Sequence, residues 1–134
     1  MLDKVGYLDD KMIFSFEDAD ICIRIRRAGW RILYFPDSHI IHFGGASRSN
    51  HNTRAVKAML QSKYAFYRKY HNGLYVITLA FCLIFSALIK ILVFTFLLIQ
   101  SKKRDKHVTS LKYYWTIVSW HLQYSEHPLK GMNN

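Results

Sequence analysis

Two adjacent carboxylates, Glu17 and Asp18, are the side chains in this 134-residue sequence best placed for acid–base chemistry. They stand where a short apolar run gives way to helical spacing, so both lie at the start of a predicted helix. A carboxylate held on a rigid helix start can act as a general base toward a hydroxyl group. The same side chains can instead only stabilise the positive end of the helix dipole, by about 0.3–1 kcal/mol. The pattern alone leaves both interpretations open.

His42 is a second candidate, because its imidazole can bind a divalent metal while the nearby Gly44 and Gly45 let the backbone approach the ligand closely. A histidine at the end of a strand can also be purely structural. His39 and His42 do not make a zinc pattern, since no further pair of ligands has metal spacing. Cys22 and Cys82 are sixty residues apart, which excludes a CxxC zinc site and a disulfide scaffold.

The elements expected around these side chains follow an α/β pattern. Ser15 to Asp18 matches a capping box, and a helix is expected over residues 17–28, with its C′ position at Gly29. An i, i+4 ion pair between Asp20 and Arg24 supports that helix. Its buried face is expected to consist of Ile21, Ile25 and Ala28. Three short segments are expected beside it, Met12–Phe16 (a strand or an ordered loop) and the strands Trp30–Phe35 and Ser38–Phe43.

An apolar stretch of 26 residues, Leu74–Ile99, contains Lys90 as its only charged residue. As a helix it would be about 39 Å long, enough to cross a hydrocarbon core of about 30 Å with some tilt. Lys90 is close enough to one end to reach the lipid headgroups. The alternative is a buried core helix, for which so short a chain offers no evident partner.

The net charge of +10 is distributed around that stretch. Residues 48–73 carry six basic and no acidic side chains, and residues 101–134 carry six basic and two acidic ones. Bases on both sides of a lipid-like segment suit an anionic membrane surface and argue against a nucleic-acid-binding domain. Both flanks satisfy the positive-inside rule, so a spanning and a re-entrant segment both remain open.

The basic segment Thr53–Tyr70 has helical spacing, with one face formed by Val56, Met59, Leu60, Lys63, Tyr64 and Tyr67. This helix is expected to lie in the membrane interface, to pack against the first domain with a solvated basic side, or to do both. The aromatic residues of Leu111–Leu122 predict a second interfacial helix.

Five sequence blocks occur in order within the first 47 residues. They are Val5–Asp10 (VGYLDD), Phe14–Arg24 (FSFEDADICIR), Arg27–Trp30 (RAGW), Tyr34–Pro36 (YFP) and His42–Ser47 (HFGGAS). Together they resemble the carboxyl-terminal part of the catalytic domain of family-2 glycosyltransferases, and most closely the bacterial rhamnosyltransferase-like enzymes. The resemblance covers Leu2–Ser47 and extends more loosely into the apolar stretch. Tyr7 departs from the family pattern, in which a second glycine is common there.

The resemblance implies roles for the matched acidic and basic residues. Asp18 would be the catalytic base on the acceptor hydroxyl, with Glu17 as the alternative. Asp20 would help to hold the acceptor. Acceptor-side or structural roles would fall to Asp9, Asp10 and Arg24.

The resemblance also implies a metal. His42 would help to bind Mg²⁺ or Mn²⁺ on the donor diphosphate, in a loop shaped by Gly44, Gly45 and Ser47. In the family, a nucleotide-binding half with a D-x-D metal motif would precede Met1. Asp18-Ala19-Asp20 has that spacing but belongs to the acidic block.

We therefore expect an α/β fold, as the C-terminal fragment of a GT-A type glycosyltransferase domain (residues 1–50). A basic amphipathic helix (51–73), a transmembrane or membrane-embedded helix (74–100) and a basic-aromatic tail (101–134) would follow it. No metal or nucleotide sugar is expected to bind tightly to this fragment alone.

The expected function is inverting transfer of a sugar from a nucleotide-sugar donor to a cell-surface glycan or lipid-linked acceptor. The chain would be located at the cell membrane, with its catalytic part on the cytoplasmic face, and would be inactive without the missing half. Membrane lipids are expected partners and nucleic acid is not. The alternative is a small, non-catalytic, single-span basic membrane protein or subunit. That alternative accounts for the charge and the apolar stretch but does not explain why the five sequence blocks occur in order.

Overall fold

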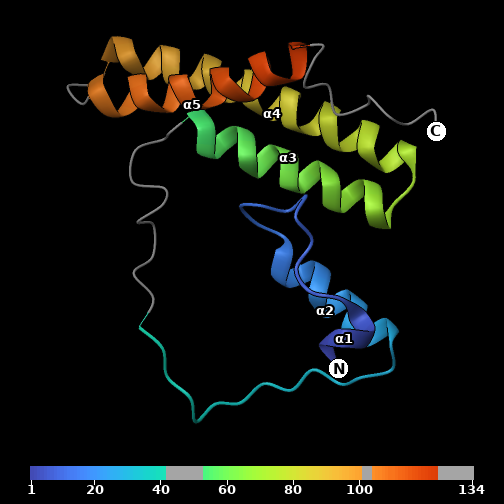
Figure 1. Cartoon of the computed structure of the whole chain (residues 1–134). Helices are drawn as coiled ribbons and strands as arrows, with labels where there is room; N and C mark the ends of the chain where they lie inside the picture. Colours follow the sequence, from blue (N-terminus) through green and yellow to red (C-terminus); the bar gives the residue numbers. More distant parts are fainter. Residues whose placement is uncertain (42–52, 101–103, 124–134) are drawn as a thin grey trace.

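The computed structural model describes residues 1–41, 53–100 and 104–123, and 73% of these residues are helical. The described helices are α1 (Leu2–Val5), α2 (Glu17–Arg27), α3 (Thr53–Tyr70), α4 (Gly73–Gln100) and α5 (Arg104–Leu122). Helix α3 lies between the paired helices α4 and α5 and the N-terminal residues (Figure 1).

The predicted α/β fold of GT-A type is wrong for the described part of the chain, which contains no strand. Met12–Phe16 forms a loop, and residues 30–35 and 38–41 are extended without a ladder partner in that part. A β-strand needs a second strand to satisfy its backbone groups, so an apolar extended segment by itself remains irregular. The last two residues of the predicted strand Ser38–Phe43 lie outside the described residues.

Helix α2 confirms the predicted helix, but its start differs from the predicted capping box. The residue before the helix is Phe16, in the left-handed region at φ 75°, and its side chain makes no capping hydrogen bond. The Ser15 hydroxyl is buried without a hydrogen bond among the described residues. Gly29 follows the helix at φ 85°, as its predicted C′ position requires.

The buried face of α2 is also not the predicted one. Its fully buried residue is Asp20, whereas Ile21 and Ile25 are only half-buried and Ala28 is exposed. This helix is therefore held to its surroundings by a carboxylate rather than by an aliphatic stripe.

The apolar core joins α3, α4 and α5. Its buried residues are Val56, Leu60, Tyr64, Val76, Ala87, Ile117, Val118 and Trp120. Tyr64 lies at its centre, with its ring 5.4 Å from that of Trp120 and its hydroxyl 2.7 Å from His121 Nε2. The face predicted for residues 53–70 is confirmed at Val56, Leu60 and Tyr64, and it packs against α4 and α5.

Helix α4 confirms the predicted apolar helix and is long and apolar enough to cross a membrane. Only 6% of its apolar 18-residue window is buried, which separates it from the core helix of a soluble protein. Its exposed large side chains include Leu74, Ile77, Phe81, Phe85, Leu88, Leu92, Phe96 and Ile99. Lys90 places its ammonium 5.1 Å from the centre of the Tyr114 ring of α5.

The N-terminal residues contact the opposite side of α3. The Phe14 amide donates to Ser62 Oγ at 3.2 Å, and the ring of Phe16 lies 5.1 Å from that of Phe66. Met12 is buried in the same contact. Helix α3 therefore connects the segment with the candidate catalytic residues to the apolar helix α4, which begins three residues after Tyr70.

Candidate functional site

The Asp20 carboxylate is the centre of a polar cluster between α2 and α3. Its side chain is 0% exposed, and its oxygens accept from three donors. The Tyr70 hydroxyl lies 2.6 Å and Lys69 Nζ 2.7 Å from Oδ1, while Arg24 Nε lies 2.8 Å from Oδ2. Two of these donors come from the last residues of α3, so the cluster fixes the end of α3 against α2.

Arg24 extends the cluster to the first residues of the chain. Its guanidinium donates to the carbonyl oxygens of Val5, Gly6 and Tyr7, with 2.9 Å to Gly6. Gly6 has φ 80°, and a Cβ atom there would lie 3.3 Å from Arg24 Nη1. The glycine thus permits both the left-handed backbone and the close approach of the guanidinium. The predicted ion pair between Asp20 and Arg24 is confirmed.

Lys69 bridges two carboxylates. Its Nζ lies 2.6 Å from Asp9 Oδ2 and 2.7 Å from Asp20 Oδ1, and Asp9 Oδ1 also accepts from the Lys11 amide at 3.1 Å. The hydrogen bond from Lys69 holds the pKa of Asp9 below its ordinary value, with help from the Lys11 amide. Both carboxylates are therefore ionised at neutral pH.

Burial has a different effect on each member of the cluster. It raises the pKa of Asp20, but hydrogen bonds from Lys69, Tyr70 and Arg24 outweigh it, and the pKa lies below its ordinary value. Burial would lower the pKa of Lys69, but its hydrogen bonds to the two carboxylates raise it. Burial and the hydrogen bond to Asp20 both raise the pKa of the Tyr70 hydroxyl.

Glu17 and Asp18, the two carboxylates predicted to include the catalytic base, lie beside this cluster at the first turn of α2. Asp18 is exposed, and its Oδ1 accepts from the Ala19 amide at 2.7 Å. Glu17 is half-buried, and its Oε2 is buried without a hydrogen-bond partner among the described residues. Asp18 therefore presents a carboxylate to the surroundings, whereas one oxygen of Glu17 is hidden from water.

The other predicted site residues have different positions. Asp10 is exposed, and Asp9 and Asp20 share Lys69. Contact of these residues with an acceptor stays a prediction. The predicted metal ligand and its loop, His42, Gly44, Gly45 and Ser47, lie outside the described residues. Within residues 1–41, 53–100 and 104–123, no group of three His, Cys, Asp or Glu side chains could hold a metal ion.

Lys69 and Tyr70 are the functional candidates that sequence reasoning missed. A usable signal was present, because residues 48–73 contain bases without acids while residues 1–47 contain seven of the nine acids. Such complementary segments tend to pair, and buried carboxylates need partners from elsewhere in the chain. Nothing in the sequence indicates which of the six bases would be chosen.

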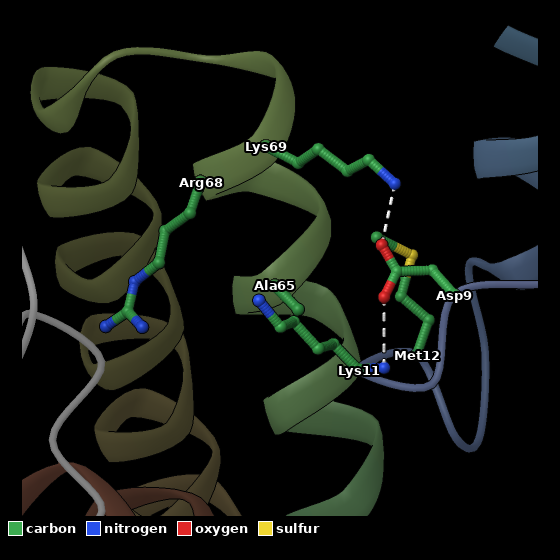
Figure 2. A pocket seen from close by; sticks show the side chains of 6 residues that line it. All are labelled: Asp9, Lys11, Met12, Ala65, Arg68 and Lys69. Atoms are coloured by element: carbon green, nitrogen blue, oxygen red, sulfur yellow. Dashed lines mark hydrogen bonds and ion pairs between the residues drawn. The ribbon is translucent and has the colours of Figure 1, made fainter. Parts of the chain in front are cut away.

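A pocket of about 420 Å³ lies next to the cluster, between α3 and the loop after α1. It is lined by Asp9, Lys11, Met12, Ala65, Arg68 and Lys69. Figure 2 shows Lys11 lying across α3 at Ala65, with Arg68 and Lys69 extending from neighbouring positions of the helix toward opposite sides. Asp9 approaches from the loop and contacts Lys69.

Comparison with curated proteins finds similarity over half of the chain. N-acetylglucosaminyl-diphospho-decaprenol L-rhamnosyltransferase of Mycobacterium tuberculosis, found in two strains, is 29% identical over 70 residues, which are 52% of this chain and 23% of that protein. An uncharacterized protein of Sinorhizobium fredii, y4gI, is 26% identical over 70 residues, which are 52% of this chain and 8% of that protein.

These similarities are distant and partial. The matched segment covers less than a quarter of either relative. No family model matches the chain, and no solved structure matches it. The comparisons therefore support a glycosyltransferase-like sequence, and this agrees with the resemblance inferred from the five sequence blocks.

Proposed function

We propose that this chain is the acceptor-activating, membrane-associated part of an inverting glycosyltransferase. The observation that carries the proposal is the 70-residue similarity to the mycobacterial rhamnosyltransferase. The exposed carboxylate of Asp18 on the first turn of α2 supports it. The donor would be a nucleotide sugar. The acceptor would be a sugar linked through diphosphate to a polyprenyl lipid, which is the class of molecule in that relative's name.

In the proposed step, Asp18 takes the proton from the acceptor hydroxyl as the hydroxyl oxygen attacks the anomeric carbon of the donor sugar. The bond between that carbon and the phosphate oxygen breaks, and the nucleoside diphosphate leaves with the electron pair. Glu17 is the alternative base, since its buried oxygen has no partner among the described residues. The Asp20 cluster holds α2 in place, so that the carboxylates keep a fixed position relative to α3.

A divalent cation on the donor diphosphate, Mg²⁺ or Mn²⁺, belongs to the same proposal. The described residues contain no cluster that fits such an ion, and His42 lies outside them. We therefore assign no step to the metal.

Membrane attachment through α4 would place this chemistry beside a lipid-linked acceptor. The outward apolar side chains of α4 would face the acyl chains, and Tyr75, at its N-terminal end, would lie at headgroup level. In this proposal α2 and α3 lie on the cytoplasmic side, where the six bases of residues 48–73 satisfy the positive-inside rule, as those of residues 101–134 also do.

The test is a chimera in which the matched segment of this chain replaces that of the mycobacterial rhamnosyltransferase. We expect transfer of L-rhamnose to N-acetylglucosaminyl-diphospho-decaprenol, and a loss of about 10²–10⁴-fold with Asp18→Asn. Asp37→Asn, at an exposed acid outside the α2 carboxylate pair, is the matched control. Nucleotide-sugar binding by each variant separates loss of the base from misfolding.

The transfer rates of the chimera variants distinguish Asp18 from Glu17 as the base, and a catalytic from a non-catalytic chain. A large loss with Glu17→Gln but not with Asp18→Asn would move the role of base to Glu17. Unchanged transfer with both variants would refute the assignment of the base to this pair. A chimera that binds the nucleotide sugar but never transfers would favour a non-catalytic membrane protein.

A further inference from the structure

The pocket between α3 and the loop after α1 contains two cations that have no counterion among residues 1–41, 53–100 and 104–123. Within the described part of the chain, neither the Lys11 ammonium nor the Arg68 guanidinium forms an ion pair or hydrogen bond. Asp9, the acid in the lining, already contacts Lys69 and the Lys11 amide. The lining therefore has three cations against one satisfied carboxylate.

The surroundings of the Arg68 guanidinium favour the binding of an anion. Arg68 is exposed at the pocket, and neighbouring groups desolvate its guanidinium enough to lower its pKa. A desolvated cation without a partner is unfavourable, and an anion with several oxygens relieves that cost through charge-assisted hydrogen bonds. Figure 2 shows the Lys11 ammonium at Ala65 and Arg68 extending along the other side of α3. Both side chains line the same pocket.

The size and composition of the pocket suit a small polar group attached to an apolar body. Its volume of about 420 Å³ falls within the range of roughly 300–1,000 Å³ common for small-molecule sites. Met12, which is 3% exposed, and Ala65 supply an apolar floor.

The pocket also lies close to where α4 begins. Arg68 precedes Gly73, the first residue of α4, by five positions. Between them, the His71 ring stacks on Tyr67 and contacts Tyr75, which forms an aromatic group at the helix junction. Aromatic side chains of this kind mark the headgroup level of membrane proteins.

We propose that Lys11 and Arg68 bind a phosphate group carried by a membrane lipid, with Ala65 and Met12 as the floor of the site. This inference rests on the membrane placement in the proposed function, but not on sugar transfer. Two kinds of lipid could supply this phosphate group. One is a polyprenyl lipid, through its diphosphate, and the other is an anionic phospholipid, through its phosphodiester.

The experiment measures binding to the full chain in neutral maltoside micelles at constant ionic strength by calorimetric titration. The probes are farnesyl diphosphate, phosphatidylglycerol and inorganic pyrophosphate. We expect a lipid phosphate to bind, and Lys11→Gln with Arg68→Gln to weaken binding by about tenfold or more. Lys4→Gln with Arg31→Gln, which removes two exposed cations outside the pocket, is the control.

A second variant, Ala65→Leu, fills the pocket without changing its charge and should also weaken binding. Tighter binding of farnesyl diphosphate identifies the diphosphate lipid as the source, and tighter binding of phosphatidylglycerol identifies the headgroup. Three results would each refute the site. They are an equal loss of affinity in the pocket and control double variants, an affinity unchanged by Ala65→Leu, and no binding of either lipid. No sugar donor is present, so failure of this site is distinguishable from failure of transfer.

Discussion

Residues 1–27 and helices α3–α5 are stabilised by opposite kinds of contact. The first region buries a carboxylate and Met12, and hydrogen bonds and ion pairs around Asp20 hold it to α3. The helical region is joined by a buried apolar cluster around Leu60, Tyr64 and Trp120. The comparison shows that the two sides of α3 make different contacts, which are polar toward the segment with the candidate base and apolar toward α4 and α5.

The largest expected effect on stability comes from a substitution in the apolar cluster that joins α3, α4 and α5. Leu60 is 1% exposed in the cluster, so Leu60→Ala should lower the free energy of unfolding of α3–α5 by about 2–5 kcal/mol. Thermal unfolding in micelles, followed by far-ultraviolet circular dichroism, measures this. Leu33→Ala, at a residue that is 76% exposed, is the control and should have no effect. Equal effects of the two substitutions would contradict the described core.

The polar side should respond to Asp20→Asn. Removing the charge leaves Arg24 and Lys69 with a weaker partner, and because both cations are partly exposed, solvent reduces the cost to roughly 2–3 kcal/mol. Amide hydrogen exchange in α2 should accelerate while that of α3–α5 changes little. Asp37→Asn, at an exposed acid, is the matched control. Faster amide exchange throughout α3–α5 would show that the Asp20 contacts also stabilise the helical region.

Acid should separate the two regions. The pKa values of Asp9 and Asp20 lie below their ordinary value of 3.8, so these carboxylates stabilise the attachment at neutral pH, and the contribution is lost as the pH falls below 3.8 toward the lowered native values. The nuclear Overhauser contact between the rings of Phe16 and Phe66 should disappear in that range. The contact between Tyr64 and Trp120 should remain, and its simultaneous loss would indicate general unfolding.

The smallest expected effect is at the hydrogen bond inside the apolar cluster. Tyr64→Phe removes a buried hydroxyl that lies 2.7 Å from His121 Nε2, which should cost about 1 kcal/mol in the same thermal unfolding experiment. Tyr67→Phe on the same helix is the control, because the Tyr67 hydroxyl makes no hydrogen bond within the described part of the chain. A loss as large as that of Leu60→Ala would make this bond a main contributor to the cluster.

The helices could be predicted from the sequence because their signals are local. The helical spacing of Thr53–Tyr70 matches the bounds of α3, although the helix expected over 51–73 runs into the first residue of α4. The apolar stretch Leu74–Ile99 differs from α4 by one residue at each end. The strands could not be predicted in the same way, since Trp30–Phe35 has the composition of a strand but no pairing partner in the described chain. Pairing depends on residues distant in the sequence, which composition does not reveal.

The candidate site shows the same limit. The position of Glu17 and Asp18 at a helix start follows from local pattern and was predicted. The burial of Asp20 was not, because its partners Lys69 and Tyr70 come from another helix. Charge patterning indicated a match between acidic and basic segments without specifying the pairs.

The extended segment Trp30–Phe35 has a consequence for handling the protein. Its apolar side chains are exposed, with Leu33 at 76% and Tyr34 at 90%, and its backbone donors and acceptors have no ladder partner in the described chain. Six residues of high β-propensity with one charge form the kind of segment that stacks into cross-β aggregates. Detergent that covers α4 does not protect this segment, so concentrated samples should self-associate through it, and a lysine at Leu33 should keep them in solution.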